Sequence, residues 1–531
     1  MPRHRSSRAS AGRNRARSLA PTTAVAAATA ILAGSLAAAV PASAAIGDGV
    51  TDVVVIAPIG GVASASGVLA PEALDRALSE GGLLDRQLDH VLGAVVTLAV
   101  DPMIAASVEV YRSGLAERDD DDPILAWGER LDGAADAFPL LYGDADPTLL
   151  TQSSIADIPA TIANGLPVPN EGIVWPRPES ITAADFDRFG EAGANAVIVA
   201  DRDLAEPAAV ATTAVASVNG HRVVVTDSAA SDVLGAAASA TTAQARAEAV
   251  AELERAILGD GGRETVVLAL DRGSADHAHL RTVLAALDAD PAIRLVTLTQ
   301  LLEGAPAANL PQSAIVESAQ PPERLAEFER VVAAERADAG FASILETPSA
   351  LIEPNRLRTF ALAGTAWLGS SEWSAAVDSA TQASAALRGS VRIVSFDSLF
   401  LADRSTLPIS VQNDLVQAVT VTVTARAATG RLDIDETPIT ITIPPGAQAA
   451  AEFPATAVSN GTVAVTATIA SPSGHPIGTP ASGRVNVQAG WETPVVAGFA
   501  VLVLLAFVFG VVRTVRRNRA TRRAVEADGD G

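Results

Sequence analysis

The pattern of hydrophobic positions divides the chain into an α/β part, a helical part and an all-β part. Between Asp52 and about Leu302, short apolar runs recur, each followed by a Gly, Pro or Asp break and then by a stretch of helical periodicity. The runs are apolar throughout, as strands covered on both faces must be. The predicted strands are Val53–Ala57, Ala94–Val100, Ala137–Tyr142, Gly172–Trp175, Ala196–Ala200, Arg222–Thr226, Thr265–Leu270 and Arg294–Leu298.

Helical segments are expected between these strands, for example at Pro71–Ser79, Leu83–Leu92, Ala183–Ala192 and Ala243–Leu258. Strand–helix units repeated in this way predict a degenerate (β/α) barrel of seven or eight strands. An open doubly wound sheet is the alternative fold.

From Pro321 to Leu387 the strand-like runs disappear and the pattern becomes helical, with segments such as Glu323–Ala339 and Ser374–Leu387. This part is expected to be a helical connector. Trp367 and Trp373 lie between its helices, and we expect them to anchor the core there.

From Val391 to Gln488 apolar and polar residues alternate in short runs such as VTVTVTARA, TPITITI and VAVTATIA. Asp, Gly, Pro and Ser separate these runs, and Pro444-Pro445-Gly446 predicts a tight turn between two of them. The spacing predicts an antiparallel β-sandwich of immunoglobulin-like type, with a spacer or docking role.

The stretch Val495–Val512 contains 18 consecutive residues without a charge. A helix of that length covers about 27 Å, close to the hydrocarbon thickness of a bilayer. Arginines flanking such a span mark its cytoplasmic side. They are Arg513, Arg516, Arg517, Arg519, Arg522 and Arg523. We therefore expect a single-pass plasma-membrane protein whose N-terminal region lies outside and whose C-terminus is cytoplasmic; a buried core helix is the alternative.

The N-terminus has the composition of a secretory signal. A basic region with six arginines between Arg3 and Arg17 precedes the apolar stretch Leu19–Val40, and Pro41–Ala44 has an A-x-A cleavage pattern. Cleavage is predicted after Ala44; an uncleaved signal anchor is the alternative and leaves the same region outside. The predicted organisation is a signal peptide at 1–44, a barrel-like domain at 45–305, a helical connector at 306–390, a sandwich at 391–489, a transmembrane helix at 495–512 and a basic cytoplasmic tail at 513–531.

The composition limits the partners. The formal net charge is −23, and such a surface repels nucleic acid and anionic lipid while it attracts cations or basic proteins. There is no cysteine, so the exported part is expected to be stabilised by burial and not by disulfides.

The candidate chemistry lies at the strand ends. Four predicted strands end in aspartate, at Asp101, Asp201, Asp227 and Asp271, and Asp144 and Asp146 follow a fifth. In a parallel barrel these positions meet at the C-terminal rim, where the active sites of this fold lie. Such carboxylates could bind a divalent cation or perform acid–base chemistry on a sugar. The alternative is that each aspartate caps the helix that follows it.

The histidines give little support for a metal site. His277 and His279 are two residues apart, and His221 precedes its strand, so we interpret all three as surface residues and assign no metal or other cofactor. The run Asp119–Asp122 is interpreted as a solvated loop. Trp175, at a strand end, is expected to pack in the core or at the rim, with stacking on a sugar as the alternative. No nucleophile, P-loop or dinucleotide motif occurs in its required context.

Four segments carry a resemblance to a known family: TLAVDP (Thr97–Pro102), LLYGDADP (Leu140–Pro147), VVLALDR (Val266–Arg272) and LPISVQNDL (Leu407–Leu415). With these the chain resembles actinobacterial envelope proteins of the domain of unknown function 6049. The resemblance implies a signal-bearing protein with one C-terminal span and a link to cell-wall assembly. The barrel is also similar to polysaccharide deacetylases and glycosidases, but the chain lacks their paired-histidine metal motif.

We therefore expect a membrane-anchored extracytoplasmic protein that binds a wall glycan or another envelope protein without catalysis. A carbohydrate-active hydrolase or deacetylase is the alternative, with Asp101, Asp144, Asp146, Asp227 and Asp271 as candidate catalytic residues. A purely structural spacer is a third possibility.

Overall fold

The computed structural model describes residues 49–115, 122–134, 136–155, 172–259, 262–488 and 492–527. The predicted signal peptide and most of the acidic run Asp119–Asp122 lie outside the described residues. The last residue of that run, Asp122, is the N-cap of α4 (Pro123–Asp132), and its carboxylate accepts hydrogen bonds from the backbone N–H groups of Ile124 and Leu125.

The first sheet of the α/β part is parallel, with strand order β3-β2-β1-β8 and with β9 beside the first half of β1. These strands correspond to five of the predicted ones. Their bounds are β1 Thr51–Ile59, β2 Thr97–Val100, β3 Ala137–Pro139, β8 Thr265–Ala269 and β9 Ile293–Val296.

The second sheet has the order β10-β6-β7-β5-β4, and β6 is antiparallel to β7. Its bounds are β4 Ile173–Val174, β5 Ala196–Ala200, β6 Val215–Val218, β7 His221–Thr226 and β10 Ala308–Leu310. The sequence pattern did not predict β6 or β10. A signal for β6 was present, because Asn219-Gly220 is a favoured two-residue hairpin turn, and both residues have positive φ (50° and 83°). β10 pairs with β6, although residues 306–390 were expected to form the connector.

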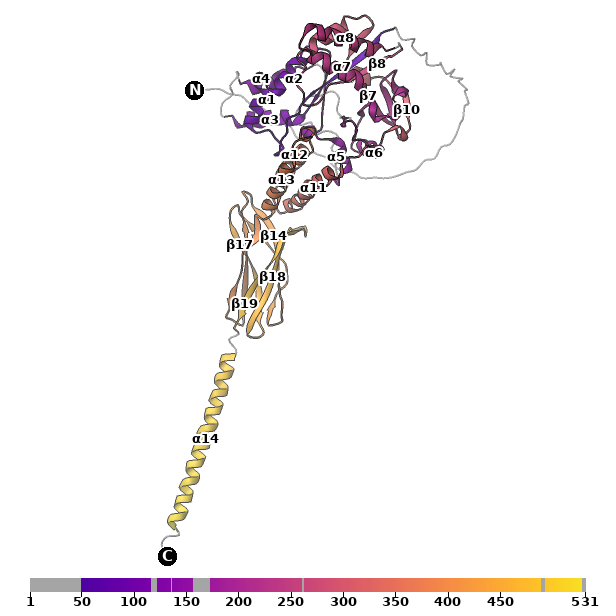
Figure 1. Cartoon of the computed structure of the whole chain (residues 1–531). Helices are drawn as coiled ribbons and strands as arrows, with labels where there is room; N and C mark the ends of the chain where they lie inside the picture. The colour runs from indigo at the N-terminus through magenta and orange to yellow at the C-terminus, as the bar shows by residue number, and fades with distance from the viewer. Residues whose placement is uncertain are drawn as a thin grey trace, which may run out of the picture. The chain divides into compact units, whose positions relative to one another are not determined.

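The two sheets enclose a common apolar core. Along β1, Val54 and Ile56 pack inward against residues of the second sheet such as Ile198, whereas Val53 and Val55 pack outward against helices. Because strand side chains alternate between faces, this division shows that both faces of β1 are covered. The α/β part therefore consists of two half-barrel sheets with helices on their outer faces (Figure 1).

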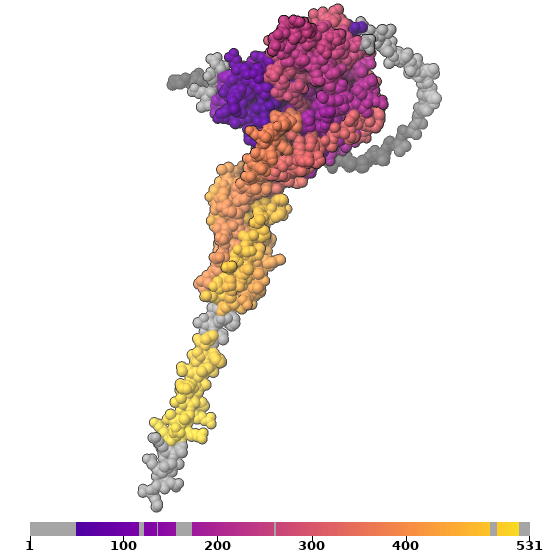
Figure 2. Space-filling model, in the orientation of Figure 1, coloured from indigo at the N-terminus to yellow at the C-terminus, as the bar shows by residue number. Residues whose placement is uncertain are grey.

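The helices that cover these sheets begin mostly at prolines or at capping side chains, as their sequences favour. They are α1 Pro71–Leu78, α2 Leu83–Val91, α3 Pro102–Gly114, α4, α5 Pro147–Gln152, α6 Ala183–Glu191, α7 Ser228–Ser239, α8 Ala243–Leu258, α9 Leu280–Asp288 and α10 Leu298–Leu302. Short 3₁₀ turns lie at η1 Tyr142–Asp144, η2 Asp201–Asp203, η3 Pro207–Val210, η4 Gln312–Ala314 and η5 Thr365–Trp367. In space-filling form, the indigo and magenta parts of the chain form one packed body (Figure 2).

Three helices form the connector: α11 Pro322–Ala342, α12 Ser349–Leu362 and α13 Trp373–Arg388. The expected core position of Trp367 is confirmed, because it is buried and its Nε1 donates to the carbonyl of Ala361 at 2.9 Å. Trp373 is half-buried and donates in the same way to Leu362. Residues at the end of α11 share an apolar cluster with the β-sandwich that follows.

The sandwich contains two sheets, of orders β11-β13-β17-β15 and β12-β19-β18-β14-β16. Alternate residues of its long strands are buried, as the sequence predicts; in β18 they are Val463, Val465 and Ala467. The pattern did not predict the short strands β12 and β15. The bounds are β11 Val391–Ile393, β12 Ser398–Phe400, β13 Arg404–Asn413, β14 Val419–Ala427, β15 Leu432–Ile434, β16 Ile439–Ile443, β17 Gln448–Ala457, β18 Gly461–Ala470 and β19 Pro476–Val487.

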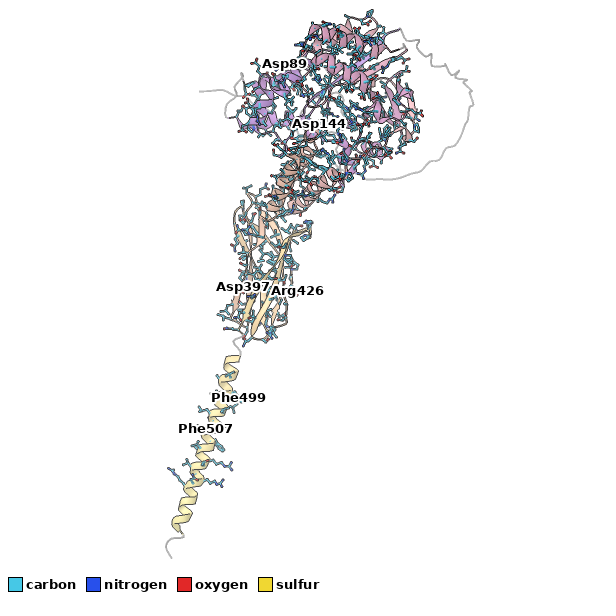
Figure 3. The ribbon with its side chains drawn as sticks, in the orientation of Figure 1. Asp89, Asp144, Asp397, Arg426, Phe499 and Phe507 are labelled. Carbon is cyan, nitrogen blue, oxygen red and sulfur yellow. The ribbon has the colours of Figure 1, made fainter. Side chains whose placement is uncertain are left out.

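The last element is the long helix α14 (Glu492–Ala527). Its segment Val496–Arg519 contains an 18-residue window with a mean hydropathy of 2.5. By length and composition α14 is the one helix among the described residues that could cross a membrane. Phe499 and Phe507 project from it (Figure 3) and are 69% and 68% exposed, as lipid-facing side chains would be.

Candidate functional site

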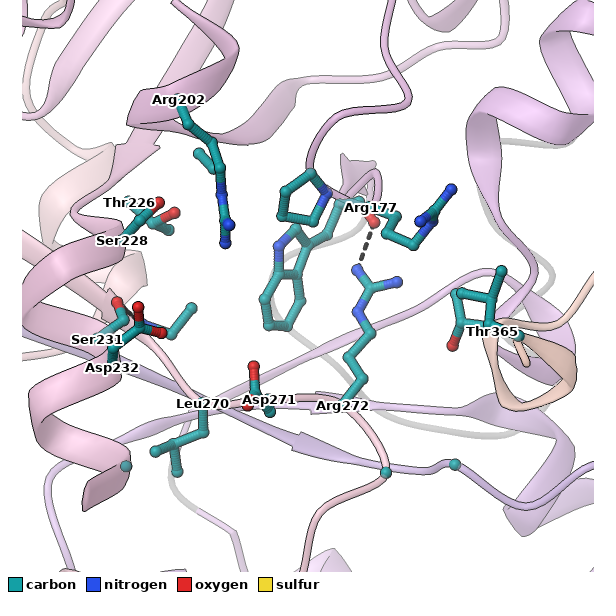
Figure 4. A pocket seen from close by; sticks show the side chains of 18 of the residues that line it. Arg177, Arg202, Thr226, Ser228, Ser231, Asp232, Leu270, Asp271, Arg272 and Thr365 are labelled. Atoms are coloured by element: carbon teal, nitrogen blue, oxygen red, sulfur yellow. Dashed lines mark hydrogen bonds between the residues drawn. The ribbon is translucent and has the colours of Figure 1, made fainter. Parts of the chain in front are cut away.

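A cavity of about 560 Å³ lies at the carboxyl ends of strands from both half-barrel sheets (Figure 4). Its walls are the ends of β5, β7 and β8, the segment after β4, one face of α7, and part of η5 with the residues that follow it. The lining side chains with polar or aromatic groups are Trp175, Arg177, Arg202, Thr226, Ser228, Ser231, Asp232, Asp271, Arg272, His277 and Thr365. The position agrees with the general location of ligand sites at the carboxyl ends of parallel strands.

Helix α7 presents a small, polar face to the cavity. Ser228, Ser231, Asp232 and Gly235 line it, at positions i, i+3, i+4 and i+7 of the helix. The other face is apolar and includes the buried Leu234. Sequence reasoning missed these residues, although a polar i, i+3, i+4 pattern directly after a predicted strand was a readable signal.

Arg272 forms a fixed wall of the cavity. Its Nη1 donates to Oδ1 of Asp144 at 3.1 Å, and its Nη2 donates to the carbonyl of Trp175 (dashed line in Figure 4). The guanidinium carbon lies 4.3 Å from the centroid of the Trp175 ring, in cation–π contact. Thr365 donates its hydroxyl to the second carboxylate oxygen of Asp144. These contacts hold β8, the segment after β4 and the connector together around the cavity.

The other two arginines differ from Arg272. Arg202 is exposed and points from the end of β5 into the cavity (Figure 4), and none of the described side chains pairs with its guanidinium. Arg177 points away from the centre of the cavity, and its Nε lies 3.9 Å from Oδ2 of Asp146. Arg202 is therefore the cation most available to a ligand.

Asp271 and Asp232 are the carboxylates of the cavity. Both are exposed, and within the described part of the chain neither accepts a hydrogen bond. His277 lies beside Asp271 and is buried. Burial lowers the pKa of His277, and the nearby charge of Asp271 opposes this effect. A neutral imidazole can both donate and accept a hydrogen bond.

Asp101 comes together with Asp144 and Asp146, which lie in the loop between β3 and α5, and the three form a buried group away from the solvent-open part of the cavity. Asp101 caps α3: its Oδ1 accepts from the N–H groups of Met103 and Gly143, both at 2.8 Å. Asp146 caps α5 through Thr148 and also accepts from Gln320 Nε2 at 2.7 Å. Figure 3 marks Asp144 inside the protein body.

Burial raises the pKa of two of these carboxyl groups. It raises the pKa of Asp101 to about 7, an effect to which the neighbouring Asp144 carboxylate adds and which the backbone N–H groups of Met103, Gly143 and Asp144 oppose. Burial also raises the pKa of Asp144, against the influence of Arg272. Asp101 and Asp144 are therefore desolvated acids held by structural hydrogen bonds.

Asp227 lies elsewhere. It caps α7 by accepting from Ala230 N at 2.9 Å, and its other oxygen pairs with Arg263 Nη2 at 2.7 Å. It borders a separate cavity of about 360 Å³. Asp201 accepts from the N–H of Arg202 at 2.8 Å. Of the five candidate residues, only Asp271 lines the large cavity.

The structure corrects the interpretation of His277 and refines that of Trp175. His277 is not a surface residue, because α9 and the segment after β8 bury it. Trp175 packs into the core between the sheets, as expected, and its remaining exposed part lines the cavity. Among the described residues, no group of three or more His, Asp or Glu side chains has the arrangement of a metal site.

Comparison with known proteins gives a family and weak structural likenesses. The model of a family described as "Family of unknown function (DUF6049)" matches residues 96–523. No curated protein matches the chain significantly.

Among solved structures, native α2-macroglobulin from Escherichia coli (from domain MG7 to the C-terminus) has 22% identity and a TM-score of 0.16, and the match covers 19% of this chain and 16% of that one. The 4-α-glucanotransferase of Thermococcus litoralis has 14% identity and a TM-score of 0.35, with 55% and 47% covered. The α-amylase AmyC of Thermotoga maritima has 9% identity and a TM-score of 0.41, with 63% and 91% covered. The chain thus spans less than half of the first two proteins, and likenesses of this size carry no functional conclusion.

Proposed function

The chain belongs to the family of unknown function DUF6049, and from this premise we propose that it is a membrane-anchored extracytoplasmic protein of the cell envelope that binds a hydroxyl-rich ligand, such as a wall glycan, in the cavity at the strand ends. The observation that carries the proposal is the composition of the cavity wall. It combines an indole, three hydroxyl groups on or beside α7, two carboxylates and the guanidinium of Arg202, and within the described part of the chain these carboxylates and this guanidinium have no side-chain partner.

These groups suit a sugar. Each sugar hydroxyl both donates and accepts hydrogen bonds, and carboxylates, serine hydroxyls and a guanidinium supply the complementary partners. The volume lies within the range of about 300–1,000 Å³ that small-ligand sites occupy. Carboxylate oxygens that have no protein partner are available to a ligand without first breaking a structural contact.

Binding without catalysis is favoured over hydrolysis. Asp101, Asp144, Asp146 and Asp227 are committed to backbone N–H groups or to arginines, and three of them are at most 2% exposed. A proton acceptor in that state has no path to a substrate in the cavity. We also propose that binding needs no divalent cation, so that EDTA leaves it unchanged.

The remaining parts serve as an anchor and a spacer in this proposal. The apolar helix would span the plasma membrane with its arginines on the cytoplasmic side and the N-terminal region outside. The sandwich, which we propose to be immunoglobulin-like, would hold the binding part away from the bilayer.

The test is binding of labelled soluble wall glycan fragments to the full chain in lipid nanodiscs, with and without EDTA. Asp271→Asn should weaken binding by roughly 10-fold or more, because it removes a charged hydrogen-bond partner that faces the ligand. Asp276→Asn is the matched control: Asp276 is also exposed and only five residues away, but it does not line the cavity.

Three outcomes separate the possibilities. Saturable binding that the cavity variant loses and the control keeps supports the proposal. Equal binding by all variants places the ligand elsewhere. No binding to any fragment, with the fold intact, rejects the glycan.

A second candidate function rests on the presence of Asp232 and Asp271 in the same cavity. Glycosidases use two carboxylates on opposite sides of the scissile bond. If the chain is such an enzyme, reducing ends appear when glycan is incubated with the wild type, and Asp232→Asn and Asp271→Asn each abolish them while binding persists.

A further inference from the structure

One end of the β-sandwich carries apolar side chains that no other part of the described chain covers. Leu399 is 56% exposed, Leu401 is 62% exposed and Val458 is 54% exposed. We call these three residues the apolar rim. Isolated exposed leucines are common on protein surfaces, so their position decides whether they have a function.

Backbone hydrogen bonds place the apolar rim at the end of the sandwich from which the chain leaves. The N–H of Gln488 donates to the carbonyl of Phe400 at 2.8 Å, which sets the residue after β19 directly beside Leu401. The N–H of Ala457 donates to Asp403 at 2.9 Å, so the turn that carries Val458 lies at the same end.

Covalent geometry keeps this end close to the apolar helix. Only residues 489–491 separate Gln488 from the start of α14 at Glu492. Four Cα–Cα steps cover at most about 14 Å, and the four helical residues before Val496 add about 6 Å. Gln488 therefore lies within about 20 Å of the first residue of the apolar segment, and the polar headgroup layer itself accounts for roughly 5–8 Å of that distance.

The sequence of the short connection favours a still closer approach. Trp491 is the residue before α14, and tryptophan concentrates at the level of the lipid headgroups. The exposed Arg404 and Arg431 at the same end of the sandwich can reach lipid phosphates, and the exposed Asp403 and Asp433 are the opposing charges there.

From these observations we propose that the apolar rim rests in the headgroup region of the bilayer, so that the sandwich is seated on the membrane as well as tethered to it. The inference rests on the proposed membrane span of α14. Its consequence is mechanical. Contact between the apolar rim and the bilayer limits tilting of the sandwich, and this restricts the range of distances between the α/β part and the membrane surface.

The absence of cysteine from the sequence permits a direct test, because any introduced cysteine is unique. Leu401→Cys and Val458→Cys report on the rim. Val416→Cys is the control: Val416 is 91% exposed and lies beyond the far end of β13, whose 10 residues cover about 30 Å. Each full-length variant is labelled with a polarity-sensitive dye and inserted into phosphatidylcholine vesicles that contain some phosphatidylglycerol.

Quenching of the dye by spin-labelled lipid is then measured after the vesicles have been purified by flotation. We expect severalfold stronger quenching at positions 401 and 458 than at 416. Equal quenching at all three positions in floated vesicles overturns the seating of the sandwich and leaves the anchor intact. Failure of the protein to float with the vesicles rejects the anchor itself, so the two failures are distinguishable.

Discussion

The buried group of Asp101, Asp144 and Asp146 and the cavity that contains Asp232 and Asp271 use carboxylates in opposite ways. In the buried group, each carboxylate accepts several hydrogen bonds and none is more than 2% exposed. In the cavity, both carboxylates are exposed and unpaired within the described structure. Both groups lie near the carboxyl ends of strands, so position along the chain does not separate them.

The difference lies in what surrounds each aspartate. Where Pro follows within one residue, as at Asp101 and Asp146, the aspartate sits at a helix start whose free N–H groups bind its oxygens. Asp271 is followed by Arg272 and a Gly-containing turn, and no helix begins there. A strand-end carboxylate is thus available for function when no helix N-terminus lies within its reach.

The largest effect is expected from Asp144→Ala, which leaves Arg272 without its carboxylate in a site where the two side chains are 14% and 4% exposed. Removing one partner of a buried pair costs about 3–5 kcal/mol of the free energy of unfolding. Unfolding in urea can be followed by tryptophan fluorescence, because Trp127, Trp175, Trp367 and Trp373 all lie in the α/β part and the connector.

Asp144→Asn is the matched control. Asparagine keeps an oxygen for Arg272 and tolerates the positive φ of 46° at this position, so it should lose clearly less stability than alanine. Equal stability of Asp144→Ala and the wild type would contradict the structural role of the loop.

The next effect is a dependence on pH. The folded-state pKa of Asp101, about 7, lies above its ordinary value of 3.8, so folding favours the protonated acid. The stability that this group contributes is complete below about pH 4 and is lost as the pH rises through 7; the total loss is at most about 4 kcal/mol. Asp101→Asn keeps an acceptor for the N–H groups of Met103 and Gly143 but cannot ionise.

Urea unfolding of the wild type and of Asp101→Asn at a series of pH values between 4 and 8 tests this. The variant should gain stability relative to the wild type as the pH rises. A constant difference across the series would show that Asp101 does not titrate in this range.

A smaller effect is expected from Asp227→Ala, about 1–2 kcal/mol, because it removes a helix cap and the partner of Arg263. Thr242→Ala is the comparison: Thr242 caps α8 through Ala245 without an arginine partner, and about 1 kcal/mol or less is expected. If Asp227→Ala abolished ligand binding without loss of stability, Asp227 would belong with Asp271 and not with the structural carboxylates.

Much of the fold could be predicted from periodicity. Alternation identified the long strands of the sandwich because one face of each is buried, and continuous apolar runs identified β1, β5, β7 and β8 because both of their faces are covered. The short strands β6, β10, β12 and β15 were missed. Strands of three or four residues show too few positions for a period, and their pairing depends on partners far away in the sequence.

The candidate site could be predicted only in part. Strand-end position correctly drew attention to the carboxyl edge of the sheets and to Asp271, but it could not distinguish capping carboxylates from free ones. It also missed Arg202 and the polar face of α7, since their role depends on the three-dimensional arrangement of β5, β7 and β8 around one cavity. The burial of His277 likewise depends on how α9 packs, which its local sequence does not show.

The smallest effect on stability is expected from Asp271→Asn, within about 0.5 kcal/mol, because an exposed side chain without a structural partner contributes little to folding. Its effect on glycan binding should be the largest among the aspartate variants. Loss of a charged hydrogen-bond partner weakens binding of a glycan by roughly 10- to 100-fold. Urea unfolding and glycan titration of the same preparation measure both quantities, with Asp276→Asn as the reference. Asp144→Asn should show the reverse, a loss of stability with binding retained to the extent that Arg272 stays in place. If Asp271→Asn instead destabilised the fold and left binding unchanged, the claim that an unpaired carboxylate at a strand end serves ligand binding would be wrong for this protein.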